Sequence, residues 1–429
     1  MFENILGQSE ACARIGSDVE REELPGSLLF EGPPLSAKLS AALELARVLS
    51  CERGAAWNCP CPQCARHRIL VHQDILLLGP KSFREELAIG ASMLETSPGP
   101  ASRYFFVRAA RKLARRFDRE LYEGEEGRLS KALPLVRSLL EGIDACSPQT
   151  ASRQIDDATA SREATKLLPV CTKLEDMLPA STPVFQIRAM EFWARLAPFG
   201  KRKTIIVEHA DRMLDGARNA LLKILEEPPT HAVFVLTTSR RQAIIPTILS
   251  RVRRYRFVQR TGSEAADVLE RIFKARQSGA ASVTDYVARF RSAASNATTE
   301  LAREYAAALA AAAGRRGGGF NEAPLAAFAA SGIDVRTAIA RTVSATSNFG
   351  SGDETNAWTF PAFLDAAGTA FSSLLREDGA GIETQRAAER YASLARDAMI
   401  RYSSYNLQPA ALAERLADSF ADPAVDSLV

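Results

Sequence analysis

Residues 27–38 read Ser27-Leu28-Leu29-Phe30-Glu31-Gly32-Pro33-Pro34-Leu35-Ser36-Ala37-Lys38. The apolar run at the start has the length of a buried strand, and the Gly-Pro-Pro sequence after it predicts a turn. A helical pattern then continues from Ala37 to Leu49. A strand, a turn and a helix in this order predict a parallel βαβ unit.

Further apolar runs along the chain predict more strands of the same sheet. They are Asp74–Leu78, Thr204–Val207, Val233–Leu236 and a short fifth strand at Arg256–Val258. After Gln259 only helical patterns follow. The expected fold class is therefore α/β plus all-α, with a parallel-sheet base followed by helices.

The chain of 429 residues and 46.6 kDa is longer than the roughly 250–300 residues at which single cores stop growing, so it predicts more than one domain. We expect a base over residues 1–258, a small helical lid over 259–318 and a helical domain over 319–429. A hinge is predicted at Gly314–Gly319. Residues 81–181 interrupt the α/β rhythm with helices at Tyr104–Tyr122 and Ser130–Ile143 and a polar connector at Ser147–Thr165, and we interpret them as an insertion.

Composition excludes several classes of protein. Hydrophobic residues make up 46% and charged residues 24%, which is a globular mixture rather than a disordered one. With 54 basic and 51 acidic residues, the net charge of +3 does not indicate a nucleic-acid binder. No apolar run approaches the roughly 20 residues of a membrane span, and the N-terminus has no signal-peptide pattern, so we expect a cytoplasmic protein without a membrane partner.

Four of the seven cysteines fall within residues 51–64, which favours a metal site over disulfides. Cys51, Cys59, Cys61 and Cys64 would form a structural Cys₄ site for Zn²⁺, which prefers four thiolates in a tetrahedron. In Cys59-Pro60-Cys61 a single residue separates two of the cysteines, and a substitute ligand from Asp74, His67 or His72 stays open. Reduced thiols without a metal are the alternative.

The turn after the first strand has only part of a phosphate-binding loop. Such a loop needs glycines, a lysine and a hydroxyl group, and here Gly32 and Lys38 are present while Ala37 and Leu39 replace the second glycine and the hydroxyl. The third strand ends in Glu208, a carboxylate that suits a metal ion, but His209 stands where a catalytic glutamate is needed. We therefore expect no ATP hydrolysis, and ATP binding stays open.

Four motifs carry a family resemblance. They are Asn219-Ala220-Leu221-Leu222-Lys223-Ile224-Leu225-Glu226-Glu227-Pro228-Pro229, Ile244–Arg251, the opening Phe2–Gln8 and Glu208–Met213. Through them the sequence resembles the AAA+ clamp-loader subunits of bacterial DNA polymerase III, and most closely the delta-prime members. The resemblance covers about Met1–Leu78 and Val184–Val258 and leaves out the insertion.

The resemblance implies a fold, a function and partners. The base would be an AAA+ nucleotidase-like domain whose nucleotide positions are Gly32, Lys38, Glu208 and Thr238, with the cysteines forming a zinc lobe and residues 319–429 a collar. Arg251 would be an arginine finger offered in trans to a neighbouring ATPase subunit, since a guanidinium is always charged and meets phosphate bidentately. The chain would be an ATPase-deficient stator within the DNA polymerase III holoenzyme, partnered by gamma/tau-like and delta-like subunits and, through them, by the sliding clamp and primed DNA.

Two other functions stay open from the sequence. One is an ATP-binding gamma/tau-like motor subunit, and the other is a zinc-stabilised DNA-binding scaffold. The segment Arg103–Arg119 bears on the second, because its arginines recur at helical spacing. We interpret it either as a helix that follows a phosphate backbone or as a solvated helix face.

Overall fold

The computed structural model describes residues 1–148, 155–179, 181–275, 278–290, 293–317, 319–346, 360–405 and 409–421. The chain divides into two compact units, Met1–Phe290 and Arg291–Val429. Among the described residues, no helix combines the length and the apolar character that crossing a bilayer requires.

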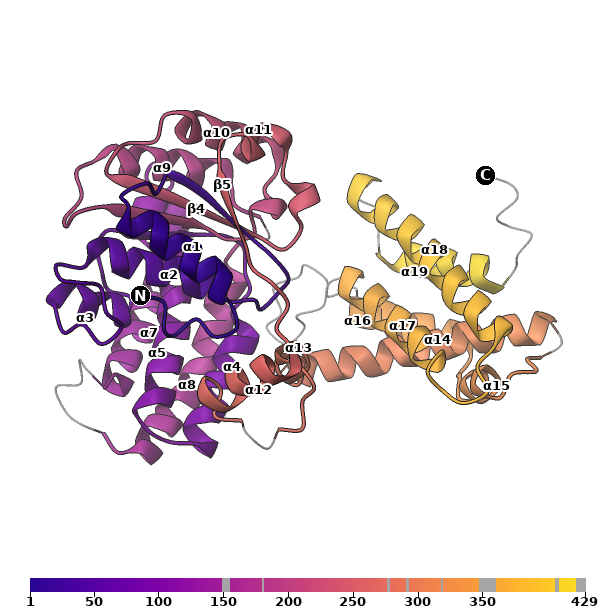
Figure 1. Cartoon of the computed structure of the whole chain (residues 1–429). Coiled ribbons are helices and arrows are strands. Elements are labelled where there is room, and N and C mark those ends of the chain that lie inside the picture. Colours follow the sequence, from indigo (N-terminus) through magenta and orange to yellow (C-terminus); the bar gives the residue numbers. More distant parts are fainter. Residues whose placement is uncertain are drawn as a thin grey trace. The chain divides into compact units, whose positions relative to one another are not determined.

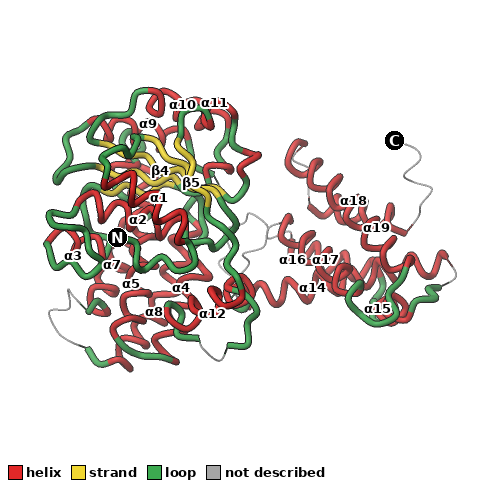
Figure 2. The backbone as a smooth tube through the Cα atoms, viewed as in Figure 1, coloured by secondary structure: helices red, strands yellow, loops and turns green. Residues whose placement is uncertain are grey.

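The first unit contains a five-stranded parallel sheet, which confirms the α/β expectation (Figure 2). The strand order is β2-β3-β4-β1-β5, so β2 and β5 are the two edges. The strands are β1 (Ser27–Glu31), β2 (Ile75–Leu78), β3 (Lys203–Val207), β4 (Ala232–Thr238) and β5 (Arg253–Arg256). The first four lie where the apolar runs predicted them, because strands buried on both faces are continuously hydrophobic.

The prediction for the fifth strand was wrong in position. The strand is Arg253–Arg256, and among these residues only Tyr255 is buried. An edge strand that buries one side chain among arginines has no apolar run, so hydrophobicity placed it too far along the chain.

Helices cover both faces of the sheet (Figures 1 and 2). One face packs on α1 (Ser9–Glu20) and α2 (Lys38–Ser50), and the other packs on α9 (Val184–Arg195), α10 (Asp215–Glu226) and the inserted helices. The remaining elements outside the insertion are α3 (Pro62–Arg68), α11 (Pro246–Leu249), α12 (Gly262–Arg271), α13 (Val283–Ala288), and the short 3₁₀ turns η3 (Ala210–Arg212) and η4 (Arg241–Ala243).

The inserted segment is a bundle of helices rather than a mixture of helix and loop (Figure 1). Its elements are α4 (Arg84–Thr96), α5 (Pro100–Ala114), η1 (Arg115–Phe117), η2 (Arg119–Leu121), α6 (Glu126–Ser130), α7 (Leu133–Cys146) and α8 (Asp157–Asp176). The connector expected at Ser147–Thr165 is therefore wrong from Asp157 onward, and residues 149–154 lie outside the described residues. Helix α8 begins there because the Asp156 side chain accepts the backbone N–H of Thr159 and caps the helix.

The secondary-structure elements described in the second unit are all helices. It comprises α14 (Ala293–Gly317), α15 (Ala323–Ala330), α16 (Val335–Thr346), α17 (Phe360–Leu374), α18 (Ile382–Tyr405) and α19 (Pro409–Ala421), around a core that includes Tyr305, Phe363 and Phe371. The hinge expected at Gly314–Gly319 is not a break, because α14 continues through Gly317. Gly319 alone has a left-handed φ of 98° there, and Gly318 lies outside the described residues.

Candidate functional site

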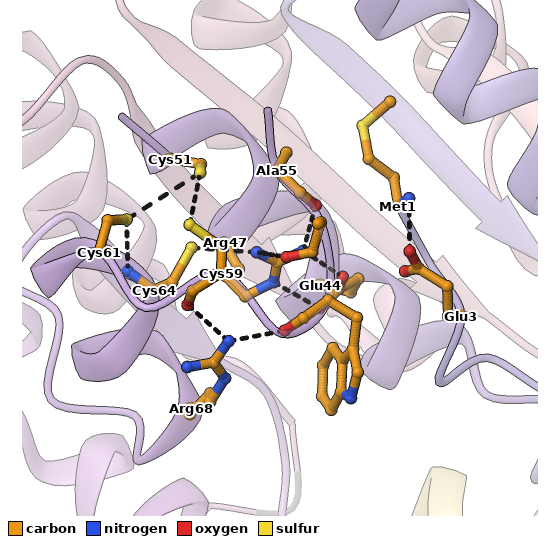
Figure 3. Close-up of polar contacts among 12 residues, drawn as sticks. Met1, Glu3, Glu44, Arg47, Cys51, Ala55, Cys59, Cys61, Cys64 and Arg68 are labelled. Carbon is orange, nitrogen blue, oxygen red and sulfur yellow. Dashed lines mark hydrogen bonds and ion pairs between the residues drawn. The ribbon is translucent and has the colours of Figure 1, made fainter. Parts of the chain in front are cut away.

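The four cysteines of residues 51–64 converge between the end of α2 and the start of α3 (Figure 3). All four side chains are buried, and their sulfur atoms lie within 4.8 Å of one another. The Cys51 Sγ lies 3.6 Å from the Cys59 Sγ and 4.0 Å from the Cys61 Sγ. A tetrahedron with Zn–S bonds of about 2.3 Å has sulfur–sulfur separations of about 3.8 Å, so the cluster has the size of a zinc site.

The short Cys59-Pro60-Cys61 spacing does not remove a ligand. Cys61 is the N-cap of α3, where its Sγ accepts the backbone N–H of Cys64, and the first helical turn returns Cys64 to the cluster. The three substitutes left open by the sequence are engaged or placed elsewhere. The Nε2 of His72 pairs with Gln63, Asp74 accepts the N–H groups of Phe199 and Gly200, and His67 stacks on His72.

A buried arginine, Arg47 of α2, holds the cysteine cluster from the side (Figure 3). Its Nη1 donates to the Sγ of Cys64 at 3.0 Å and to the carbonyl oxygen of Ala56 at 3.2 Å. Its Nη2 donates to the carbonyl oxygen of Ala55 at 2.8 Å, and Nε and Nη2 together grip Glu44 at 3.0 and 2.7 Å. All five N–H donors of the guanidinium are thus used, and an N–H directed at sulfur stabilises a thiolate ligand. The sequence reasoning missed this residue, since its only signal is its place one helical turn before Cys51.

The nucleotide positions expected from the sequence come together at the carboxyl ends of the strands. Lys38 follows β1, Glu208 follows β3 and Thr238 ends β4, and the parallel strands β3, β4 and β1 are neighbours. Gly32 has a φ of 155°, and a Cβ there would lie 2.3 Å from the carbonyl oxygen of Phe257. Close packing alone therefore requires this glycine.

Lys38 turns back onto its own loop. Its ammonium group donates to the carbonyl oxygens of Gly32 at 2.8 Å and Pro33 at 2.5 Å, and to the Ser36 hydroxyl at 3.1 Å. Burial lowers the pKa of Lys38 to about 8, although the carboxylates of Glu208 and Asp211 oppose this shift. The three N–H donors of this lysine are therefore taken up within the protein.

The acidic residues after β3 are paired as well. Glu208 forms a buried ion pair with Arg116, which comes from η1 of the inserted segment. Asp211 accepts the Thr238 hydroxyl at 2.9 Å and the Nε of Arg240 at 3.0 Å. Burial alone would raise the pKa of Asp211, but these two donors outweigh it and hold the pKa below its usual value.

The cavity beside the loop is small. It has a volume of about 10 Å³ and is lined by residues 34–36, 258–260, 265 and 282–284. Arg260 helps to close it by donating from Nη1 to the carbonyl oxygen of Leu35 at 2.6 Å. A volume of this size has room for about one water molecule.

Arg251 lies at the opposite side of the sheet, near the amino ends of the strands. It precedes β5 by two residues, so it lies near the amino ends of the strands, whereas Lys38 follows the carboxyl end of β1. A five-residue strand such as β1 separates its amino end from its carboxyl end by about 16 Å. The Arg251 guanidinium is 31% exposed and donates to Glu226, the last residue of α10, with an Nε–Oε1 distance of 3.0 Å.

The basic segment Arg103–Arg119 matches neither interpretation made from the sequence. Arg108, Arg111 and Arg115 point inward and donate to backbone carbonyl oxygens of residues 67–75. Lys112 pairs with Glu86. These side chains fasten the inserted segment to the rest of the unit, so neither a DNA-binding nor a solvated face describes them.

Comparison with known proteins shows that segments of this chain are similar to subunits of DNA polymerase III. Residues 145–261 match a family described as "DNA polymerase III, delta subunit". The chain is 36% identical over 95 residues to "DNA polymerase III subunit tau" of Bacillus subtilis, and 40% identical over 67 residues to "DNA polymerase III subunit delta'" of the same organism. The family match includes residues 145–181, so the expectation that the resemblance leaves out the whole insertion is wrong.

These matches cover only part of each protein. The aligned segment is 22% of this chain and 17% of the tau subunit, and 15% of this chain and 20% of the delta-prime subunit. Among solved structures, a gamma subunit-related protein from Thermotoga maritima aligns over 95% of this chain and 98% of that one, at 14% identity. Its TM-score of 0.36 is too low to support a conclusion about the site.

Proposed function

This chain is related to the clamp-loader subunits of bacterial DNA polymerase III, and from that relationship we propose that it is a delta-prime-like stator of the replicative clamp loader. It does not hydrolyse ATP itself. It supplies Arg251 to the ATP site of a neighbouring gamma/tau-like subunit, and the assembly, which includes a delta-like subunit, places a sliding clamp on primed DNA in the cytoplasm.

The position of Arg251 carries this proposal. The side chain is partly exposed at the amino edge of the sheet, while Lys38, Glu208 and Thr238 meet at the carboxyl edge. An arginine so far from its own chain's loop does not reach a nucleotide there, whereas its partly exposed side chain, now paired with Glu226, lies where a neighbouring molecule can meet it. A guanidinium at a neighbour's phosphates accelerates hydrolysis by stabilising the transition-state charge.

The contacts that Lys38 and Glu208 make within the protein support the proposal that this chain does not hydrolyse ATP. Phosphoryl transfer needs a lysine on the phosphates and a carboxylate for the metal ion. Here Lys38 binds its own loop and Glu208 binds Arg116. His209 has a pKa lowered by burial, and a neutral imidazole does not supply the negative charge of a catalytic carboxylate.

A structural zinc ion and three functional regions complete the proposal. Cys51, Cys59, Cys61 and Cys64 would bind Zn²⁺ as four thiolates, which gives a closed site that stabilises the lobe and leaves no position for substrate. Residues 1–258 serve as the AAA+ base, 259–318 as the lid and 319–429 as the collar that joins the other subunits. The proposed lid does not coincide with a compact unit, because residues 262–288 pack within the first unit and residues 293–317 belong to the second.

The test is Arg251→Ala in the reconstituted loader. We expect the complex to assemble normally and the one ATP site that Arg251 completes to lose on the order of 10³ in turnover. Steady-state phosphate release and gel filtration measure the two effects. Arg254→Ala, an exposed arginine three residues away, is the control and keeps full turnover. Full ATPase activity and clamp loading with Arg251→Ala would exclude the stator role.

A gamma/tau-like motor is the second candidate, because tau and gamma/tau subunits are among the relatives. It differs from the stator in one measurable property, the release of phosphate by the purified chain alone. The stator proposal expects none above background. Sustained phosphate release that Lys38→Ala abolishes would favour the motor.

A further inference from the structure

The carboxylate of Glu208 is paired with a positively charged side chain of the same protein, Arg116. The Nη2 of Arg116 donates to the Oε2 of Glu208, and the two residues are only 2% and 7% exposed. The guanidinium carbon of Arg116 lies 5.4 Å from the centre of the Phe83 ring, so the rest of the group faces an aromatic side chain. Its Nε and Nη1 have no hydrogen-bond partner among the described residues. Glu208 is therefore the acceptor on which this buried arginine depends.

The position of Arg116 is fixed by the helix before it. Arg108, Arg111 and Arg115 are spaced by three and four residues, so they share one face of α5 and its continuation η1. Their Nη1 atoms donate to the carbonyl oxygens of His67 at 3.2 Å, Ile69 at 2.8 Å and His72 at 2.8 Å, respectively. These bonds attach the inserted segment to the chain that leads into β2. Arg116, the next residue, is thereby directed toward the end of β3.

We propose that Arg116 is the permanent counter-ion of Glu208 and takes the place that a metal ion has beside such a carboxylate in nucleotide-hydrolysing proteins. The inserted segment then closes the sheet edge electrostatically, so that no bound nucleotide or metal ion is needed to hold it together. The inference rests on the proposed identification of this edge as a former nucleotide site. It is independent of Arg251, because it is tested on the isolated chain.

The energetics of buried ion pairs give a sharp expectation. Removing one member leaves an uncompensated charge in a low-dielectric interior and is strongly destabilising. Replacing both members by apolar side chains of similar volume is often neutral. A pair that balances charge is thus distinguished from two residues that contribute only packing.

The experiment is a double-mutant cycle with Arg116→Met, Glu208→Met and the double variant, followed by thermal unfolding. We expect each single substitution to lower Tm by on the order of 10 °C, and the double variant to recover more than half of that loss. Arg119→Met, an exposed arginine of the same segment, is the matched control and shifts Tm by less than about 2 °C. A double variant that loses the sum of the two single shifts would overturn the proposal.

A second measurement tests whether Glu208 is open to a metal ion. We expect Mg²⁺ alone, and Mg²⁺ with ATP, to leave the Tm of the wild-type chain unchanged, because ligand binding to the folded state would raise it. A rise of several degrees that disappears in Glu208→Gln would show a metal ion at the carboxylate and would also overturn the proposal. Failure of the Arg251 experiment leaves both of these results unaffected.

Discussion

Arg47 links α2, the helix that follows β1, to the cysteine cluster. It contacts the sulfur atom of Cys64, the loop carbonyl oxygens of Ala55 and Ala56, and the carboxylate of Glu44. Each contact uses a different part of a planar fork, so a lysine in its place keeps the charge but loses most of the geometry. At the scale of single residues, the proposed metal site therefore depends on an arginine that is not a ligand.

For Arg47→Lys we expect zinc affinity to fall by about 10–100-fold, the usual effect of losing a group that hydrogen-bonds a metal ligand. Competition with a chromogenic chelator measures it. Arg53→Lys is the control, because the Arg53 side chain is exposed beside the same loop. Equal zinc affinity in the wild type and Arg47→Lys would show that the N–H to Cys64 does not matter to the metal.

His67 makes the stability of the lobe depend on pH. It is buried, both ring nitrogens have no hydrogen-bond partner among the described residues, and burial lowers its pKa to about 2, with smaller effects from His72, Arg47, Arg108 and Arg115. Below its ordinary pKa of about 6.5, the unfolded chain binds a proton that the folded chain does not. The free energy of unfolding should therefore be highest above pH 6.5 and fall as the pH drops toward 2.

The measurement is urea unfolding of the wild type and His67→Phe between pH 6 and 4.5. We expect the wild-type free energy of unfolding to fall more steeply, by up to about 1.4 kcal/mol per pH unit. Contributions from the cysteines and carboxylates are shared by both proteins and cancel in the comparison. Parallel pH profiles would mean that His67 is charged or paired in the folded protein.

At the scale of elements, α3 is the part of the fold that the metal is expected to hold. It has only seven residues, begins at a proline after Cys61 and ends before the arginine-bound turn at residue 69. A helix this short is marginal in isolation, so its order comes from its surroundings. The proposed zinc ion supplies part of these surroundings by joining Cys61 and Cys64 of the α3 region to Cys51 at the end of α2.

We expect the purified chain to contain one zinc ion, and Cys61→Ser to lose it. Elemental analysis measures the metal, and hydrogen exchange of residues 51–70 against the sheet measures the loss of local order. Cys12→Ser is the control, since Cys12 lies outside the cluster and keeps the metal. A metal-free chain with a protected lobe would exclude structural zinc.

The sequence predicted elements well where local pattern decides them. The strands β1 to β4 lie within a few residues of their predicted positions, and the elements described after residue 319 are helices, as expected. It failed where distant contacts decide, as in β5, which holds its place by pairing with β1. The hinge predicted at the glycines near the end of α14 failed for the same reason. The long helix continues through Gly314 and Gly317 in spite of their low helix propensity.

For the molecule as a whole, the sequence motifs indicated which residues belong to the candidate site, but they did not indicate which partners those residues bind. The spacing of the four cysteines predicted that they cluster, whereas the family resemblance named Lys38, Glu208 and Thr238 as a set, and these lie at the ends of neighbouring strands. No local signal showed that Arg116, 92 positions before Glu208, would reach it. A basic run looks the same in sequence whether its partners are phosphates, water or buried carbonyl oxygens, so its role is set by tertiary structure.

The two edge strands of the sheet, β2 and β5, affect whether copies of this protein can associate by extending the sheet. On β5 the side chains of Arg253, Arg254 and Arg256 are exposed, and at β2 the Arg115 side chain donates to the carbonyl oxygen of Ile75. Charged side chains along one edge strand and an occupied carbonyl acceptor on the other disfavour pairing with a strand of another chain. Oligomers of this protein should consequently form through helices, and aggregates seeded by sheet extension should be rare even in concentrated solution.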